Sequence, residues 1–222
     1  MNQIATPDRR LHPRFISLEG GEGAGKTTAL AAIEKVLSQR GEVVVTREPG
    51  GTGMAERIRN LLLDAGDETL TSHSELLLMF AARSQLVANV IQPALQRGAF
   101  VVSSRFVDSS YAYQGAARGL DMALIHALDQ ATVSVMPNLT FLLDLDVHTG
   151  RQRIEARGEA LDRIELEEAA FFERVREGYR RRAMAAPERF VTIDAAMNPA
   201  AVVEAIEQTL HQRLGPVPAH SS

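Results

Sequence analysis

Residues Gly20 to Thr27 have the types and the spacing that can hold a polyphosphate. Their string, GGEGAGKT, fits the pattern G-x-x-x-x-G-K-[ST], in which glycines let backbone N–H groups turn inward around phosphate oxygens. Lys26 can reach the β- and γ-phosphates of a nucleotide, and the Thr27 hydroxyl can hold Mg²⁺. A chance match in a chain of this composition has a probability of roughly 10⁻³. The string therefore predicts nucleoside-triphosphate binding and leaves open which group is phosphorylated.

A strand before this loop and a helix after it must position these residues. The string FISLE at 15–19 predicts the strand, and Leu30, Ile33 and Leu37 have the spacing of a helix. Further strands are expected at 43–46, 99–103, 139–144 and 190–194. Further helices are expected at 54–63, 74–96 with a kink or restart at Pro93, 122–130, 149–156, 165–185 and 199–213. The alternation predicts an α/β fold in which a five-stranded parallel sheet is covered by helices on both faces.

The composition limits what else the chain does. Its 222 residues fit a single domain, 1–222, and we expect the tails 1–13 and 215–222 to be disordered. The 24 basic and 28 acidic residues give a net charge of −4, which argues against nucleic-acid binding through bulk positive charge. The absence of cysteine excludes disulfides, thiolate metal sites and cysteine nucleophiles.

The sequence pattern predicts neither secretion nor insertion into a membrane. Residues 1–14 contain no apolar segment of the kind found in signal peptides. The longest uninterrupted apolar run, Leu76–Ala82, is much shorter than the ~20 residues that cross a bilayer. We therefore expect a cytoplasmic protein that has no membrane or nucleic-acid partner.

Five strings of the chain resemble the bacterial type of thymidylate kinase. They are EGGEGAGKTT at 19–28, TREPGGT at 46–52, AAR at 81–83, SRFVDSSYAYQG at 104–115 and ARGEALDRIE at 156–165. The resemblance extends from Phe15 to about Leu210 and implies a P-loop NTPase fold with a short mobile lid at about 148–163, called the lid segment below. It also implies ATP-dependent phosphorylation of dTMP to dTDP, with Mg²⁺, by a cytoplasmic homodimer.

The resemblance implies roles for individual residues. The catalytic residues are expected to be Lys26, Arg105 and Arg157. The nucleotide is expected to contact Gly20, Gly21, Glu22, Gly23, Ala24, Gly25, Lys26, Thr27, Thr28 and Arg153, with Thr27 also on the metal. The expected dTMP contacts are Glu22, Arg47, Pro49, Phe80, Arg83, Arg105, Ser110, Tyr113 and Gln114.

The chemistry of these dTMP contacts is specific. The guanidinium of Arg83 is implied to recognise the carbonyl edge of thymine, and Arg105 the dTMP phosphate. Glu22 is implied to contact the 3′-hydroxyl, and Tyr113 to lie under the ribose where a 2′-hydroxyl would need space. The family carries an aromatic that stacks on thymine at the position of Met79, so we expect the neighbouring Phe80 to stack here.

One position departs from the family pattern. Ser104 stands where the family has Asp next to the arginine, and the lost carboxylate is expected to reduce metal affinity or rate unless Glu19 or Asp108 compensates. Two alternatives therefore stay open beside dTMP phosphorylation. One is another P-loop nucleoside-monophosphate kinase, and the other is a nucleotide-binding homologue with weakened catalysis.

Overall fold

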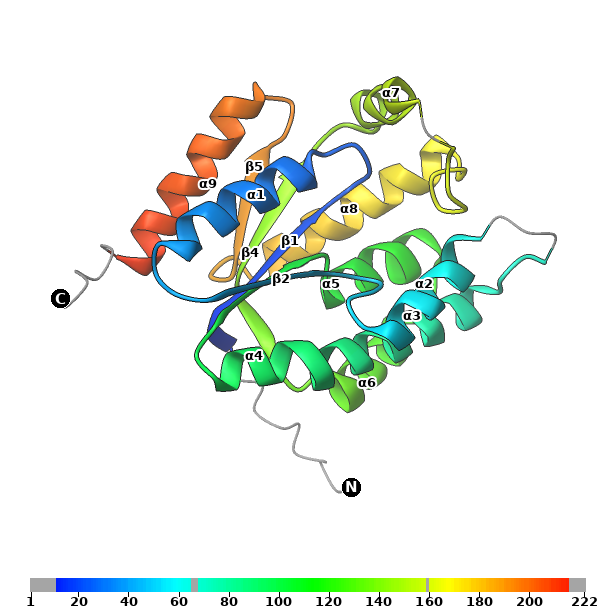
Figure 1. The fold of residues 1–222 in the computed structure, drawn as a ribbon. Coiled ribbons are helices and arrows are strands. Elements are labelled where there is room, and N and C mark those ends of the chain that lie inside the picture. The colour runs from blue at the N-terminus through cyan, green and yellow to red at the C-terminus, as the bar shows by residue number, and fades with distance from the viewer. Residues whose placement is uncertain (1–10, 65–67, 159, 216–222) are drawn as a thin grey trace.

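The computed structural model describes residues 11–64, 68–158 and 160–215, which contain a single parallel sheet (Figure 1). The strand order is β2-β3-β1-β4-β5. The strands are β1 (Leu11–Gly20), β2 (Val43–Arg47), β3 (Phe100–Ser104), β4 (Met136–Asp144) and β5 (Phe190–Asp194). The prediction of five parallel strands is confirmed. Because β1 lies in the centre, the phosphate loop that follows it emerges between the carboxyl ends of β3 and β4.

Helices cover both faces of the sheet, as expected (Figure 1). On one face, α1 (Lys26–Ser38) and α9 (Pro199–Leu214) pack on a core that includes Ile16, Leu18 and Phe141. The other face is covered by α3 (Ser72–Leu86), α4 (Gln92–Gln96), α5 (Val107–Ser110), α6 (Met122–Thr132) and α8 (Ala169–Ala185). Outside these layers, α2 (Gly53–Leu63) packs on α3, and α7 (Val147–Arg157) packs beside α8.

The first strand begins earlier than the sequence pattern predicted. Leu11 and His12 already pair with Met136 and Pro137 of β4, and a register shift separates this pairing from the one that starts at Ile16. Residues 11–13 are therefore strand, and their expected disorder is wrong. At the other end, Gly215 caps α9 with a φ of 70°, and its carbonyl accepts a 2.6 Å hydrogen bond from Arg40. The remaining tail residues lie outside the described part of the chain.

The long helical pattern at 74–96 forms three consecutive helical segments, and the expected restart at Pro93 is confirmed. It starts at Ser72, because the Thr71 side chain caps it by accepting from the Ser74 N–H. A π-helical turn, η1 (Val87–Ile91), follows α3, and α4 then restarts with Pro93 in its first turn. By length and composition alone the run Ser72–Gln96 could cross a membrane, but 44% of its most apolar window is buried inside the protein. That burial is typical of a helix that packs on a sheet.

One helical stretch was missed and one helix start was wrong, and both lie near the site. The stretch 107–117, not assigned from sequence, forms α5 and a π-helical segment, η2 (Tyr111–Ala117). The helix expected from Glu165 starts only at Ala169. The Asp162 carboxylate holds the preceding residues in a turn, because it accepts hydrogen bonds from the Ile164 and Glu165 N–H groups.

Candidate active site

The phosphate loop joins β1 to α1 and curls around the Lys26 side chain. Gly23 and Gly25 have φ values of 71° and 85°, a left-handed conformation that side chains with a Cβ rarely adopt. The Lys26 ammonium donates to the carbonyl oxygens of Gly20 at 3.1 Å and Gly21 at 2.6 Å. Thr27 and Thr28 are exposed in the first turn of α1. The loop therefore presents a cation, two hydroxyl groups and a helix N-terminus together, the chemistry that binds a polyphosphate.

Arg105 connects this loop to the end of β3. Its φ of 68° is the only positive value among the described non-glycine residues, and its N–H donates to the Leu18 carbonyl at 2.8 Å. This backbone turn directs the side chain toward the loop, where it donates to the Gly20 carbonyl at 3.0 Å and to Glu22. The guanidinium also lies over the Tyr113 ring, 5.0 Å from its centroid. Three predicted site residues, Glu22, Arg105 and Tyr113, thus meet at one point.

Glu22 is ionised because of the cations beside it. Burial acts to raise its pKa, but the charges of Arg105 and Lys26 and the hydrogen bond from Tyr113 outweigh burial and lower the pKa to about 2. The Tyr113 hydroxyl donates to Glu22 at 2.9 Å. Burial and the charge of Arg105 lower the pKa of Lys26 to about 8. Phosphates bound beside Lys26 would raise this pKa again and favour the charged ammonium. Glu22 therefore balances two cations that a phosphorylated ligand would share.

A cavity of about 120 Å³, called the inner cavity below, opens from this point toward α2 and α3. Five of the predicted dTMP contacts line it: Glu22, Pro49, Arg105, Tyr113 and Gln114. The lining also contains residues that were not selected from sequence, including Arg59, Leu62, Glu75, Met79, Ser109 and Arg163. Arg59 had a detectable signal, because it lies on the helix that directly follows TREPGGT. Its guanidinium donates to the Pro49 carbonyl at 3.1 Å.

Four predicted dTMP residues do not line the inner cavity. Arg83 is fully buried and pairs with Glu48, with Nη2 and Oε2 2.7 Å apart, while its Nη1 donates to Ser110 Oγ at 3.0 Å. Phe80 is in the core, with the Arg83 guanidinium 4.6 Å from its ring centroid. Arg47 is half exposed and pairs with Glu56 at 2.9 Å. The structure therefore brings Met79, rather than Phe80, to the cavity wall.

The two acids named as possible substitutes for a carboxylate at Ser104 have hydrogen-bond partners of their own. Asp108 is fully buried and accepts hydrogen bonds from Arg182 and Arg189 at 2.7 to 3.0 Å. Glu19 accepts from the Phe106 N–H at 2.7 Å, from Ser109 Oγ at 2.7 Å and from the Tyr179 hydroxyl at 2.9 Å. Burial, followed by the charge of Asp108, raises the pKa of Glu19 to about 7. Through these hydrogen bonds both acids hold the α5 region in place.

The lid segment places one predicted arginine on the phosphate loop and the other away from it. Arg153 donates to the Gly23 carbonyl at 3.3 Å. Arg157, at the end of α7, donates to both oxygens of Glu165 at 3.0 Å, and 40% of its side chain is exposed. Arg157 is therefore near the surface in this conformation and is bound to an acid just beyond the lid segment.

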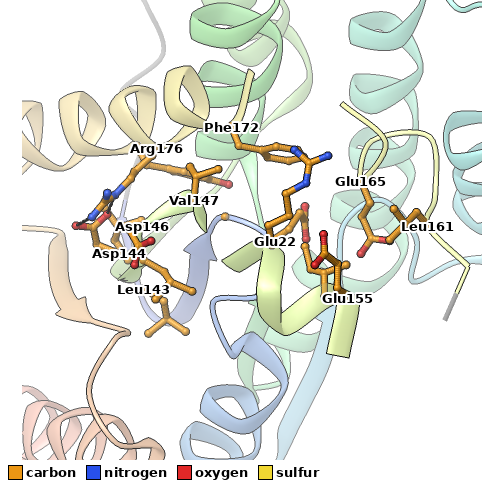
Figure 2. Close-up of a pocket in the computed structure, with 16 residues that line it drawn as sticks. Glu22, Leu143, Asp144, Asp146, Val147, Glu155, Leu161, Glu165, Phe172 and Arg176 are labelled. Atoms are coloured by element: carbon orange, nitrogen blue, oxygen red, sulfur yellow. Dashed lines mark hydrogen bonds and ion pairs between the residues drawn. The ribbon is translucent and has the colours of Figure 1, made fainter. Parts of the chain in front are cut away.

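A second cavity, of about 80 Å³, lies beneath the lid segment (Figure 2). Figure 2 shows Arg176 beside Asp144 on one side of it, and Leu161 and Glu165 on the opposite side. Its other walls include Val147, Phe172 and Tyr179. Since Glu22 lines both cavities, they meet at the phosphate loop.

Comparison with known proteins agrees with this geometry. A family model described as thymidylate kinase matches residues 18–206. Thymidylate kinases of Pseudomonas fluorescens strain Pf-5 and Chromohalobacter salexigens are 52% and 53% identical over 202 and 204 residues, covering 90% of this chain and 96% of each relative. A crystal structure of thymidylate kinase from Ehrlichia chaffeensis is 34% identical, with a TM-score of 0.71 over 89% of this chain and 97% of that one. The phosphate loop, the sheet and these relatives together show that the chain belongs to the thymidylate kinase family.

Proposed function

We propose that the protein transfers the γ-phosphoryl group of ATP to dTMP and releases dTDP and ADP. The single observation that carries this proposal is the contact of Arg105 with both Gly20 and Glu22. Through it, a triphosphate-binding loop and the inner cavity share one pair of charged side chains. A monophosphate held in the inner cavity would then meet the end of the ATP chain at Arg105.

The reaction is an in-line displacement. A dTMP phosphate oxygen forms a bond to the γ-phosphorus of ATP, the bond from that phosphorus to the ADP oxygen breaks, and ADP leaves with the electron pair. The attacking oxygen is already ionised at neutral pH, so no general base is needed. Lys26, Arg105 and Arg157 are proposed to stabilise the charge that builds up on the transferring group. Catalysis then consists of positioning and charge neutralisation.

The residues present fit a magnesium ion that arrives with the nucleotide. Among the described residues, no group of three or more His, Cys, Asp or Glu side chains could hold a metal by itself. The exposed Thr27 hydroxyl, at the start of α1, is the ligand that the loop offers. Mg²⁺ commonly takes few protein ligands beside substrate phosphates, and when bound it would neutralise phosphate charge.

On the dTMP side, the cavity lining suggests specific roles. Tyr113 and Glu22 are proposed to lie against the sugar, Gln114 against the base, and Met79 to pack on the thymine ring in the place of the family's aromatic. Arg83 and Ser110 are proposed to act one layer behind the cavity wall, because both are buried: Arg83 pairs with Glu48 and donates to Ser110. Arg47 and Phe80 are less favoured as dTMP contacts, since neither lines the cavity.

We propose a cytoplasmic homodimer in which 1–222 forms a single domain, with 148–163 as a mobile lid and with no nucleic-acid or membrane partner. Leu77 on α3 and Leu61 on α2 are 55% and 61% exposed, and these neighbouring helices offer an apolar surface for a second subunit. Light scattering measures the subunit number directly.

The substrate assignment is tested by ADP release with dTMP, dUMP, AMP or GMP as the only acceptor. We expect the highest kcat/KM with dTMP, and a preference over dUMP of roughly 10-fold or more, since the two differ by one buried methyl group. Lys26→Ala should abolish turnover while the circular dichroism spectrum stays that of the folded protein. A higher kcat/KM for any of the other acceptors would overturn the assignment.

A further inference from the structure

The Gln114 side chain has one amide atom satisfied and the other not. Its Nε2 donates to Glu75 Oε1 at 2.8 Å. Its Oε1 is buried and has no hydrogen-bond partner among the described residues. Only 2% of Gln114 is exposed, yet the residue lines the inner cavity. A buried carbonyl oxygen without a partner destabilises the protein. An oxygen in this position therefore points to a ligand that donates a hydrogen bond.

Glu75 fixes which amide atom is left over. A carboxylate can only accept hydrogen bonds, so the Gln114 atom facing it has to be the nitrogen. Glu75 is itself held in place, because Arg118 Nη2 lies 3.1 Å and Arg163 Nη2 lies 2.7 Å from its Oε2. Burial acts to raise the pKa of Glu75, but the hydrogen bonds from Gln114 and Arg118 outweigh it and lower the pKa. The acceptor is therefore ionised and fixed in position.

A buried carbonyl oxygen without a protein partner, on a residue that lines the inner cavity, can distinguish pyrimidine bases that bind there. The N3 position of thymine and of uracil carries a hydrogen and donates, whereas N3 of cytosine is an acceptor. An acceptor facing another acceptor leaves both desolvated and unpaired, which costs more than losing a contact. The orientation of one amide is then enough to exclude a cytosine base.

We propose that Glu75 is a positioning residue for base specificity: it holds the Gln114 amide with Oε1 toward the base, so that the site accepts a ring N–H donor and rejects a ring acceptor. This inference rests on the proposed placement of the dTMP base against Gln114. It adds a residue that acts on the substrate only through Gln114. It also predicts that the methyl group of thymine is recognised by other residues.

The test compares kcat/KM for dTMP, dUMP and dCMP in wild type and Glu75→Gln. The new amide can donate as well as accept, so Gln114 is free to turn its Nε2 toward the base. We expect the dTMP/dCMP ratio to fall at least ~10-fold, while the dTMP/dUMP ratio stays within about 2-fold of wild type. An unchanged dTMP/dCMP ratio overturns the proposal, and so does an equal loss of both ratios.

Three variants separate this role from a merely structural one. Arg118→Gln removes one of the two arginines that hold Glu75 and lies outside the cavity wall; it should lower the dTMP/dCMP ratio less than Glu75→Gln does, because Arg163 still holds the carboxylate. In a Gln114→Ala background, Glu75→Gln should have no further effect on that ratio. Glu75→Asp keeps an acceptor without a donor and should keep the discrimination against dCMP. A drop in the ratio for Arg118→Gln or Glu75→Asp that equals the drop for Glu75→Gln contradicts the proposal.

Two further measurements complete the test. Gln114→Ala alone should raise KM for dTMP, and an unchanged KM would instead mean that the proposed base position is wrong. If Glu75→Gln fails to fold, wild-type NMR still decides. The Gln114 side-chain NH₂ signals, assigned from their loss in Gln114→Ala, should be protected from solvent exchange both before and after dTMP is added. Rapid exchange in either state overturns the proposal.

Discussion

Gly23 of the phosphate loop and Gly150 of α7 are in direct backbone contact. A Cβ atom added at Gly23 would lie 2.3 Å from the Gly150 carbonyl oxygen, and one added at Gly150 would lie 2.6 Å from the Glu22 carbonyl oxygen. Real Cβ atoms do not approach backbone this closely. Any side chain at position 23 would therefore push α7 away from the phosphate loop. A cation for the transferring phosphoryl has to come from another position, and α7 carries arginines next to this contact.

Gly150→Ala tests how tightly the loop and α7 are packed. In an open helix this change stabilises by up to about 1 kcal/mol, but here the close contact should make it destabilising by about 2 kcal/mol. We expect a melting temperature lower by roughly 4 to 8 °C and weaker ATP binding. Gly53→Ala is the matched control, because a Cβ there meets nothing within 4 Å in the first turn of α2. Equal melting temperatures for the two variants would refute the contact.

Arg157→Ala tests the assignment of the lid arginine. Its loss should lower kcat by about 10³-fold or more, as for other arginines that neutralise a transferring phosphoryl, with little change in KM for dTMP. The melting temperature should hardly change, because the side chain is 40% exposed and surface ion pairs contribute little. Arg181→Ala, which removes an exposed ion pair on α8, is the control and should keep wild-type turnover. Near-normal kcat for Arg157→Ala would sink the assignment.

Glu19 should make the stability of the protein depend on pH. Its pKa is about 7 in the folded chain against an ordinary value of 4.5, so the folded state binds more protons between these values. The contribution is complete below about pH 4.5 and is lost as pH rises through about 7, a difference of roughly 3 kcal/mol at most. Glu19→Gln keeps an acceptor for Phe106 and removes the titration.

The measurement is urea unfolding of wild type and Glu19→Gln at about pH 5 and about pH 8. The two proteins should be closest in stability at the lower pH, and the variant should gain on wild type at the higher one. Glu22 does not confuse the comparison, because its pKa of about 2 places its own loss of stabilisation below about pH 4.5. Parallel pH dependence in the two proteins would contradict the raised pKa.

Ser104→Asp tests the departure from the family pattern. Ser104 ends β3 beside Leu18 of β1, two residues before the phosphate loop, and Glu19 and Asp108 are committed to other hydrogen bonds. A carboxylate here should lower the Mg²⁺ concentration for half-maximal activity by roughly 10-fold, since carboxylates are preferred magnesium ligands. Ser104→Asn, which has the same shape without the charge, should stay near wild type. An equal effect of Asn and Asp would show that charge is not the cause.

The parts of the fold that could be predicted from sequence are those with a local pattern. FISLE at 15–19 and FVTID at 190–194 are short apolar runs bounded by polar residues, and both are strands. The π-helical segment η2 was missed because the small and polar residues around Tyr111 have no helical period. It is held instead by contacts with α8, such as the close approach of Gly178 to Ala112. Such packing joins residues far apart in the chain, and no local pattern records it.

The site shows the same division between local and long-range information. Lys26 was predicted from the phosphate-loop motif and Arg105 from the family resemblance, and both side chains lie at the phosphate loop. The AAR string predicted that Arg83 recognises the base. In the folded chain Arg83 is instead buried against Glu48, 35 residues away, and no local pattern indicates this pairing. Phe80 was chosen over Met79 for its ring, but the helix turns that ring into the core. Which face of a helix meets a cavity depends on the neighbouring elements.

The contacts of Arg163 limit how far Arg157 can move. Arg163 is fastened to α2 through the Leu62 and Leu63 carbonyls at 2.7 and 3.2 Å and to α3 through Glu75 at 2.7 Å. Arg163 lies six positions after Arg157 in the sequence, and six fully extended steps of the chain span roughly 20 Å. While these hydrogen bonds hold, Arg157 stays within that distance of Arg163, which is itself bound to the wall of the inner cavity. A movement of that wall would therefore also move the region that the Arg157 side chain can reach.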